Sequence, residues 1–122
     1  MNNSFPKSAK LCGKIRISDL YHTGRRFTQW PMRVSYRPVE GETRVLIWAP
    51  KSLFKHAVDR NRLRRLMREA YRLQQEPLQN ATQHYEIAFN YLDKAEQPYA
   101  VIEKAMRKAI RKIAETHEEG VA

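Results

Sequence analysis

Basic side chains are concentrated between residues 51 and 72, where the chain reads KSLFKHAVDRNRLRRLMREAYR. This segment contains eight lysines or arginines and only two acidic residues, Asp59 and Glu69. An arginine guanidinium is planar, keeps its charge at any physiological pH and can donate paired hydrogen bonds to phosphate oxygens. The chemistry predicted for this segment is therefore the binding of a polyanion.

Most of this segment is predicted to be one helix with two different faces. At about 100° per residue, its apolar side chains recur at the spacing of a buried stripe. The stripe consists of Leu63, Leu66, Met67, Ala70 and Tyr71. The opposite face carries Asn61, Arg65, Arg68 and Arg72, with Arg64 at its edge and Arg60 and Arg62 on the flanks. Guanidiniums this close repel one another when unpaired, so we expect this face to bind phosphates.

The whole chain has the composition of a nucleic-acid-binding protein. Its 122 residues are expected to form a single RNA-binding domain (1–122), with residues 1–10 as a flexible arm and residues 115–122 as a flexible tail. The formal net charge of +10 and the pI near 10 lie in the range of nucleic-acid binders. We find no long apolar run, signal-peptide core or lipidation motif, so no membrane partner is expected. Cys12 is the single cysteine, which favours a reducing, cytoplasmic location.

The residues that could supply catalysis or bind a metal are scattered. The four histidines, His22, His56, His84 and His117, do not match any zinc-site spacing with Cys12. Hydrolysis of a phosphodiester by protein groups usually needs clustered carboxylates holding Mg²⁺, and no such cluster is evident. We therefore expect no catalytic residue, no metal ligand and no cofactor intrinsic to the protein.

The remaining periodicities predict an α+β fold. The expected elements are a helix over residues 11–23 that ends at Gly24, a loop at Arg25–Arg26, strands over 32–37, 43–49 and 84–91, and a last helix from Pro98. Strand 43–49 is the more continuously apolar of the first two, as a central strand would be. The basic helix, expected to fade near residue 76, connects it to strand 84–91 and so predicts parallel pairing by a crossover that is normally right-handed. The expected architecture is a single-domain, two-layer α/β sandwich: one mixed sheet with helices on one side and the other sheet face partly open.

The segment from Phe54 to Arg72 resembles the protein subunit of bacterial ribonuclease P. The hallmark of that family is Ala-Val-x-Arg-Asn-Arg, here residues 57–62, followed by an apolar residue, two basic residues and an arginine-bearing apolar helix. Residues 11–27 are similar to the family's first helix with its closing glycine, and residues 85–89 to the strand after the basic helix. The resemblance covers about residues 5–113.

This resemblance implies a protein cofactor of a ribozyme. The implied partners are the ribonuclease P RNA, which removes the 5′ leader of precursor tRNA with Mg²⁺ bound mainly by the RNA, and the precursor tRNA itself. No protein partner is evident. The family fold also implies a left-handed βαβ crossover, against the general rule.

The resemblance assigns two sets of binding residues. Contacts to the ribozyme RNA are expected from Lys51, Lys55, Arg60, Asn61, Arg62, Arg64, Arg65, Arg68 and Arg72. A leader-binding cleft between the sheet and the first helix is expected from Lys14, Tyr21, Phe27, Arg33 and Tyr36. Aromatic side chains suit such a cleft because unpaired bases stack on them, at roughly 1–3 kcal/mol per base. By this chemistry Phe5 and Trp48 are further candidates.

Several alternatives remain open on the sequence. Arg60 could instead hold the helix by salt bridges, Asn61 could cap nearby backbone, and Tyr21 and Tyr36 could belong partly to the core. The main alternative function is a ribosomal or other structural RNA-binding protein without a role in tRNA processing. A DNA binder with the helix in a major groove is disfavoured because the arginines are spread too broadly. A protein-only nuclease is the weakest alternative.

Overall fold

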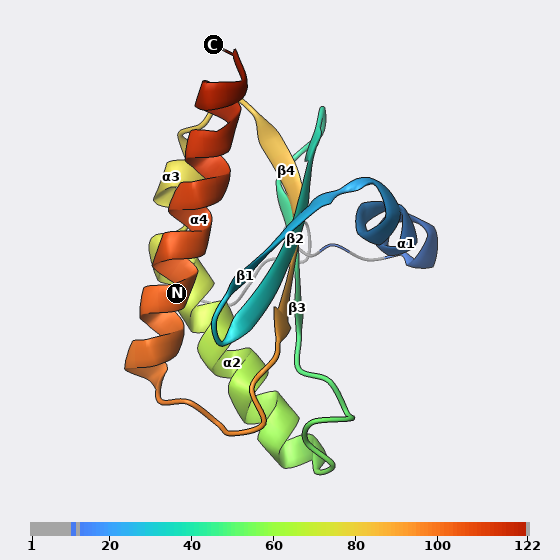
Figure 1. Ribbon diagram of the computed structural model, residues 1–122, viewed down its shortest axis with the longest axis vertical. Helices are drawn as coiled ribbons and strands as arrows, with labels where there is room; N and C mark the ends of the chain where they lie inside the picture. The colour runs from blue at the N-terminus through green and yellow to red at the C-terminus, as the bar shows by residue number, and fades with distance from the viewer. Residues whose placement is uncertain (1–10, 12, 122) are drawn as a thin grey trace, which may run out of the picture.

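Four strands form one mixed sheet that has helices on both faces (Figure 1). The computed structural model describes residue 11 and residues 13–121. In chain order its elements are α1 (Lys14–Thr23), β1 (Arg25–Gln29), β2 (Met32–Val39), β3 (Arg44–Trp48), α2 (Ala57–Gln74), α3 (Glu76–Gln79), β4 (His84–Tyr91) and α4 (Tyr99–Val121). The predicted arm, residues 1–10, lies outside the described residues. Helix α4 continues through residues 115–121, where the sequence predicts a tail.

The strand order in the sheet is β1-β2-β4-β3. Strands β1 and β2 form an antiparallel hairpin, β2 pairs antiparallel with β4, and β3 pairs parallel with β4. The predicted α+β class, the mixed sheet and the parallel pairing across the basic helix are confirmed. The prediction that strand 43–49 is central is wrong, because β4 lies at the centre and β3 at an edge. Strand β3 is apolar because Val45 and Ile47 enter the main core while Leu46 packs under α1.

The main core lies between the sheet and the pair α2 and α4. Strand side chains such as Val34 and Phe89 pack there against Met67 of α2 and Met106 of α4. Helix α1 packs on the opposite face of the sheet (Figure 1). Its Leu20, together with Leu11 before the helix, lies against Ala88 of β4. The prediction that all helices lie on one side is therefore wrong. Small buried residues on this face, Ala88 and its register partner Ser35, leave room for α1.

A close backbone approach joins α1 to β1. Arg25 and Arg26, predicted as a loop, are the first two residues of β1 and pair with Tyr36 and Ser35 of β2. Gly24 before them has an extended backbone with φ of −77° and donates its N–H to the Leu20 carbonyl at 2.8 Å. A Cβ atom on Gly24 would lie 2.6 Å from that oxygen and 2.8 Å from the Tyr36 carbonyl oxygen. Glycine is therefore required at position 24 because a Cβ atom would not fit there, and not because the backbone is left-handed.

Candidate nucleic-acid interface

Helix α2 turns its arginines outward because its apolar stripe is buried. Leu63, Met67, Ala70 and Tyr71 are buried in the main core, and Leu66 is partly buried against it. The stripe predicted from the sequence is therefore confirmed. The basic residues lie on the remaining faces of the helix, where their contacts differ from one arginine to the next.

Arg60 fastens the loop that precedes α2. Its Nη1 donates hydrogen bonds to the carbonyl oxygens of Phe54 at 2.9 Å and Lys55 at 3.0 Å. The Phe54 ring is buried and lies 5.8 Å, between centroids, from the Tyr91 ring. Arg60 thus holds the helix start, as the alternative interpretation expected, but through backbone carbonyls and not through a salt bridge.

Two further arginines of α2 form ion pairs within the molecule. Arg62 lies 2.8 Å from a Glu96 carboxylate oxygen in the loop before α4 and 3.5 Å from Asp59. Arg72 pairs with Glu69 at 2.5 Å, and the hydrogen bond from Arg72 lowers the pKa of that carboxyl. The positive charges of Arg62 and Arg72 are therefore at least partly neutralised before any ligand binds.

The other three arginines of α2 form a cluster of uncompensated charge. Arg65 and Arg68 have no hydrogen bond or ion pair with any residue that the structure describes, and the described contacts of Arg64 are with neutral groups, the Asn61 side chain and the Trp48 ring. Partial burial, together with the charges of Arg64 and Arg65, lowers the pKa of Arg68. Arginine nevertheless stays protonated at neutral pH, so this cluster carries positive charge that could bind an anionic ligand.

The structure thus divides the nine residues predicted to contact the ribozyme RNA. It brings together the free arginine face, which we define as Asn61, Arg64, Arg65 and Arg68 on α2. The side chains of Lys51 and Lys55 are exposed on the loop before α2. Arg60, Arg62 and Arg72 are engaged within the protein, as described above.

A second set of polar and aromatic groups lies on the sheet face that α1 partly covers. The Asn90 amide of β4 donates to the Tyr21 hydroxyl of α1 at 3.1 Å. Directly beside Asn90 in the sheet register are Arg33 of β2 and Trp48 of β3. Because neighbouring residues in register share one face of a sheet, Tyr21, Arg33 and Trp48 are gathered around Asn90. Asn90 was not predicted, although it is a polar residue at the end of an apolar strand.

This face continues to a shallow cleft at the β1–β2 hairpin. The cleft has a volume of about 310 Å³ and is lined by Arg26, Phe27, Thr28 and Arg33. Both arginines are exposed, whereas Phe27 is partly buried and packs against the main core. The structure therefore places Arg33 at this cleft and adds Arg26, which the sequence assigned to a loop, whereas Phe27, the register partner of Val34, turns its ring toward the main core. Lys14 is exposed in the first turn of α1.

Tyr36 does not line this surface. Its side chain is only 6% exposed and belongs to the main core, on the opposite face of β2 from Arg33. The ring makes edge contacts with Phe27 and Tyr85, at centroid distances of 5.8 and 6.1 Å. The structure therefore places Tyr36 apart from the other residues predicted for the leader cleft, because side chains alternate along β2 and Tyr36 falls on the face that meets the main core.

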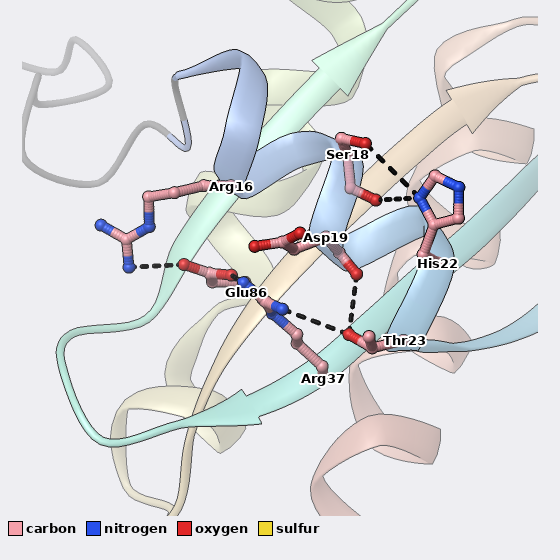
Figure 2. A network of polar contacts seen from close by, with 7 residues as sticks. All are labelled: Arg16, Ser18, Asp19, His22, Thr23, Arg37 and Glu86. Atoms are coloured by element: carbon pink, nitrogen blue, oxygen red, sulfur yellow. Dashed lines mark hydrogen bonds and ion pairs between the residues drawn. The ribbon is translucent and has the colours of Figure 1, made fainter.

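A buried carboxylate holds α1 in place over the sheet (Figure 2). Glu86 of β4 is fully buried and pairs with Arg16 of α1 at 2.5 Å and with Arg37 of β2 at 2.8 Å. Arg37 also donates to the Thr23 hydroxyl at the end of α1, at 3.2 Å. Both ends of α1 are therefore tied to the sheet, which fixes the position of Tyr21 between them. The sequence feature that could have indicated this network is a glutamate inside the otherwise largely apolar strand HYEIAFNY.

The described part of the chain has neither a metal cluster nor a membrane-spanning helix. Within it, no three His, Cys, Asp or Glu side chains gather closely enough to hold a metal ion. None of its helices is both long and apolar enough to cross a bilayer.

Comparison with known proteins identifies the family. Residues 5–114 match the family model described as Ribonuclease P. The chain is 35% identical over 117 residues to the ribonuclease P protein component of Porphyromonas gingivalis, covering 88% of this chain and 85% of that protein. The fold is similar to that of the Staphylococcus aureus RNase P protein, with a TM-score of 0.73, 19% identity, and coverage of 88% of this chain and 96% of that one. The RNase P protein from Thermotoga maritima gives a TM-score of 0.72 at 15% identity, covering 84% and 96%. The chain therefore belongs to the ribonuclease P protein family, the protein subunits of an endoribonuclease of tRNA processing.

Proposed function

We propose that this chain assembles with the ribonuclease P RNA and binds the 5′ leader of precursor tRNA within that complex. The RNA subunit then carries out the hydrolysis that removes the leader, with Mg²⁺ bound mainly by the RNA. The observation that carries this proposal is the free arginine face of α2, where the charge is matched by no described acidic group.

The free arginine face is suited to a structured RNA because its charges are already close together. Arg64, Arg65 and Arg68 are held on adjacent turns of a helix whose other side is packed in the core. Few degrees of freedom remain to be lost when phosphates bind them. Each phosphate contact also releases a counterion from the RNA, which makes binding favourable at low salt.

The α1 side of the sheet is suited to a single strand. Tyr21 and Trp48 offer aromatic rings for unpaired bases, and Arg26 and Arg33 offer charge to the phosphates between them. Such stacking depends little on base identity. The Glu86 network supports this role because it keeps Tyr21 in a fixed place relative to Trp48 and Arg33.

Precursor-tRNA cleavage tests the assembly most directly. A cognate bacterial ribonuclease P RNA is assayed at low, near-physiological Mg²⁺, with and without this protein. We expect strong stimulation by the protein and no cleavage by the protein alone. Tight RNA binding without stimulation would contradict the proposal and favour a structural RNA-binding role, and cleavage without added RNA would contradict it in favour of a protein nuclease.

The leader contact is tested by varying the length of the leader. Replacing both Tyr21 and Trp48 by alanine removes two stacking surfaces and should raise KM for a long-leader substrate by about tenfold or more. A substrate with a minimal leader should be affected little, because it does not reach these rings. Equal effects on the two substrates would show that the rings act elsewhere.

A further inference from the structure

A cleft on α4 shares no residue with either surface described above. It lies between the β1–β2 turn and α4, on the α4 side of the sheet, whereas α1 covers the other side. Its volume is about 370 Å³, within the range of roughly 300–1,000 Å³ typical of small-ligand sites. The lining residues are Gln29, Trp30, Val101, Lys104, Ala105 and Lys108.

Trp30 lines this cleft and is largely exposed to solvent. It occupies the two-residue turn between β1 and β2, and its side chain is 53% exposed. Its indole is absent from the buried core clusters of the described residues. The ring is thus available to stack on a ligand, and burial in the core does not account for a tryptophan at this position.

The charges beside Trp30 are not neutralised. Lys104 and Lys108 are exposed, lie one turn apart (about 6 Å along the helix axis), and have no ion pair with any described residue. The nearby acid Glu103 pairs instead with Arg107, on another flank of α4.

An open aromatic ring beside a row of lysines has the composition of a site for unpaired nucleotides. A ring can stack on a base of any identity, and lysines one helical turn apart suit successive phosphates of an extended strand. A duplex would use the lysines but would leave the ring without a partner, because its bases are already stacked. An acidic protein surface would use the lysines but has no row of bases that could stack on the exposed indole.

We propose that this cleft binds an unpaired nucleotide of single-stranded RNA, with its base stacked on Trp30 and the adjoining phosphates on Lys104 and Lys108. The site is additional to the free arginine face and to the sheet surface beside α1. Its existence does not depend on the proposed leader contact, because the two sites share no residue.

The two tryptophans of the chain allow each site to be followed separately. The indole N–H signals of Trp30 and Trp48 are recorded by NMR on the full-length ¹⁵N-labelled protein and assigned with a Trp30→Phe variant. A short oligouridylate is then titrated in. We expect the Trp30 signal to shift saturably, and inorganic polyphosphate, which has no bases, to move it far less.

Charge-matched variants test the lysines. Lys104→Gln with Lys108→Gln should weaken the binding seen at Trp30 by about tenfold and leave the Trp48 titration nearly unchanged. Lys94→Gln with Arg107→Gln removes the same charge away from the cleft and should leave both titrations nearly unchanged. All four positions have solvent-accessible side chains, and the same spectra report whether each variant is folded.

Three results would overturn the proposal. One is a Trp30 signal that stays still while Trp48 saturates, which would leave the proposed leader contact intact. Another is equal weakening by the two double variants, since the effect would then be one of overall charge. The third is an equal response of Trp30 to polyphosphate and to oligouridylate, because no base would then be recognised.

Discussion

Whether an arginine on α2 can bind a phosphate depends on what its guanidinium already contacts. Arg60 is held by two backbone carbonyls, and Arg62 and Arg72 are held by carboxylates. Arg65 and Arg68 have no such partner among the described residues. At the scale of single residues, the affinity for RNA should therefore be unevenly shared, with the largest part on the free arginine face.

Glu86 should stabilise the fold through its two arginine partners. Replacing Glu86 with alanine removes the carboxylate that Arg16 and Arg37 share, and it leaves Arg37, 23% exposed, short of a partner. We expect the free energy of unfolding to fall by about 1–3 kcal/mol, measured by urea denaturation. Glu103→Ala breaks a partly exposed pair with Arg107 at the surface of α4 and should cost less than about 0.5 kcal/mol. Equal losses in the two variants would contradict the role given to the Glu86 network.

Tyr71 should make the protein sensitive to alkaline pH. Burial raises the pKa of Tyr71 to about 12, whereas an unfolded tyrosine titrates near 10. The folded state therefore keeps a proton that the unfolded state loses, so this contribution is complete below about pH 10 and is lost as the pH rises through 12. Between about pH 9 and pH 11.5, wild type should lose about 2 kcal/mol more stability than Tyr71→Phe. Parallel losses in both proteins, measured by urea denaturation, would contradict this assignment.

At the scale of elements, the junction of α1 with β1 depends on one glycine. In Gly24→Ala the new methyl group would press on two backbone oxygens, of Leu20 and Tyr36, which cannot rotate away as a flexible side chain could. We expect a loss of about 1–3 kcal/mol in the free energy of unfolding. Gly41→Ala is the matched control, because nothing lies within 4 Å of a Cβ there. If both alanine variants unfold at the same urea concentration, the close approach is not a constraint.

Periodicity was enough to predict the elements with a strong apolar pattern. The buried stripe of α2, the alternation of β4 and the parallel pairing of β3 with β4 all follow from it. Strand β1 was missed because in RRFTQ only Phe27 is apolar. The predicted positions of β3 and α1 were also wrong. An apolar pattern shows that a segment is buried but does not show which neighbouring element covers it. The handedness of the crossover stays a prediction.

The candidate site was predictable in residue types but not in partners. The arginines of α2 could be recognised as a group because they are close in sequence. Their division into paired and free members depends on residues such as Glu96, 34 positions from Arg62. Glu86 and Asn90 are likewise joined to α1 across 69 or more residues, a distance over which local patterns carry no information.

At the scale of the whole molecule, Trp48 connects the free arginine face with the proposed leader surface beside α1. Strand β3 lies at the sheet edge, and the Arg64 guanidinium of α2 is 5.8 Å from the Trp48 ring centroid. In the sheet register the same residue lies beside Asn90, which binds Tyr21. An RNA on the free arginine face and a leader on the sheet would therefore be adjacent, which suits a subunit that presents a substrate strand to a catalytic RNA.

The affinity of the ribonuclease P RNA for an Arg65→Ala and Arg68→Ala double variant tests the central claim most directly. Both side chains point away from the core, so the variant should fold normally and bind about ten- to a hundredfold more weakly than wild type. The slope of log affinity against log salt should also become shallower by about two. Lys94→Gln with Arg107→Gln, which removes the same charge elsewhere, should retain affinity close to that of wild type. Wild-type affinity and salt dependence in a well-folded Arg65 and Arg68 variant would show that this face is not where the RNA binds.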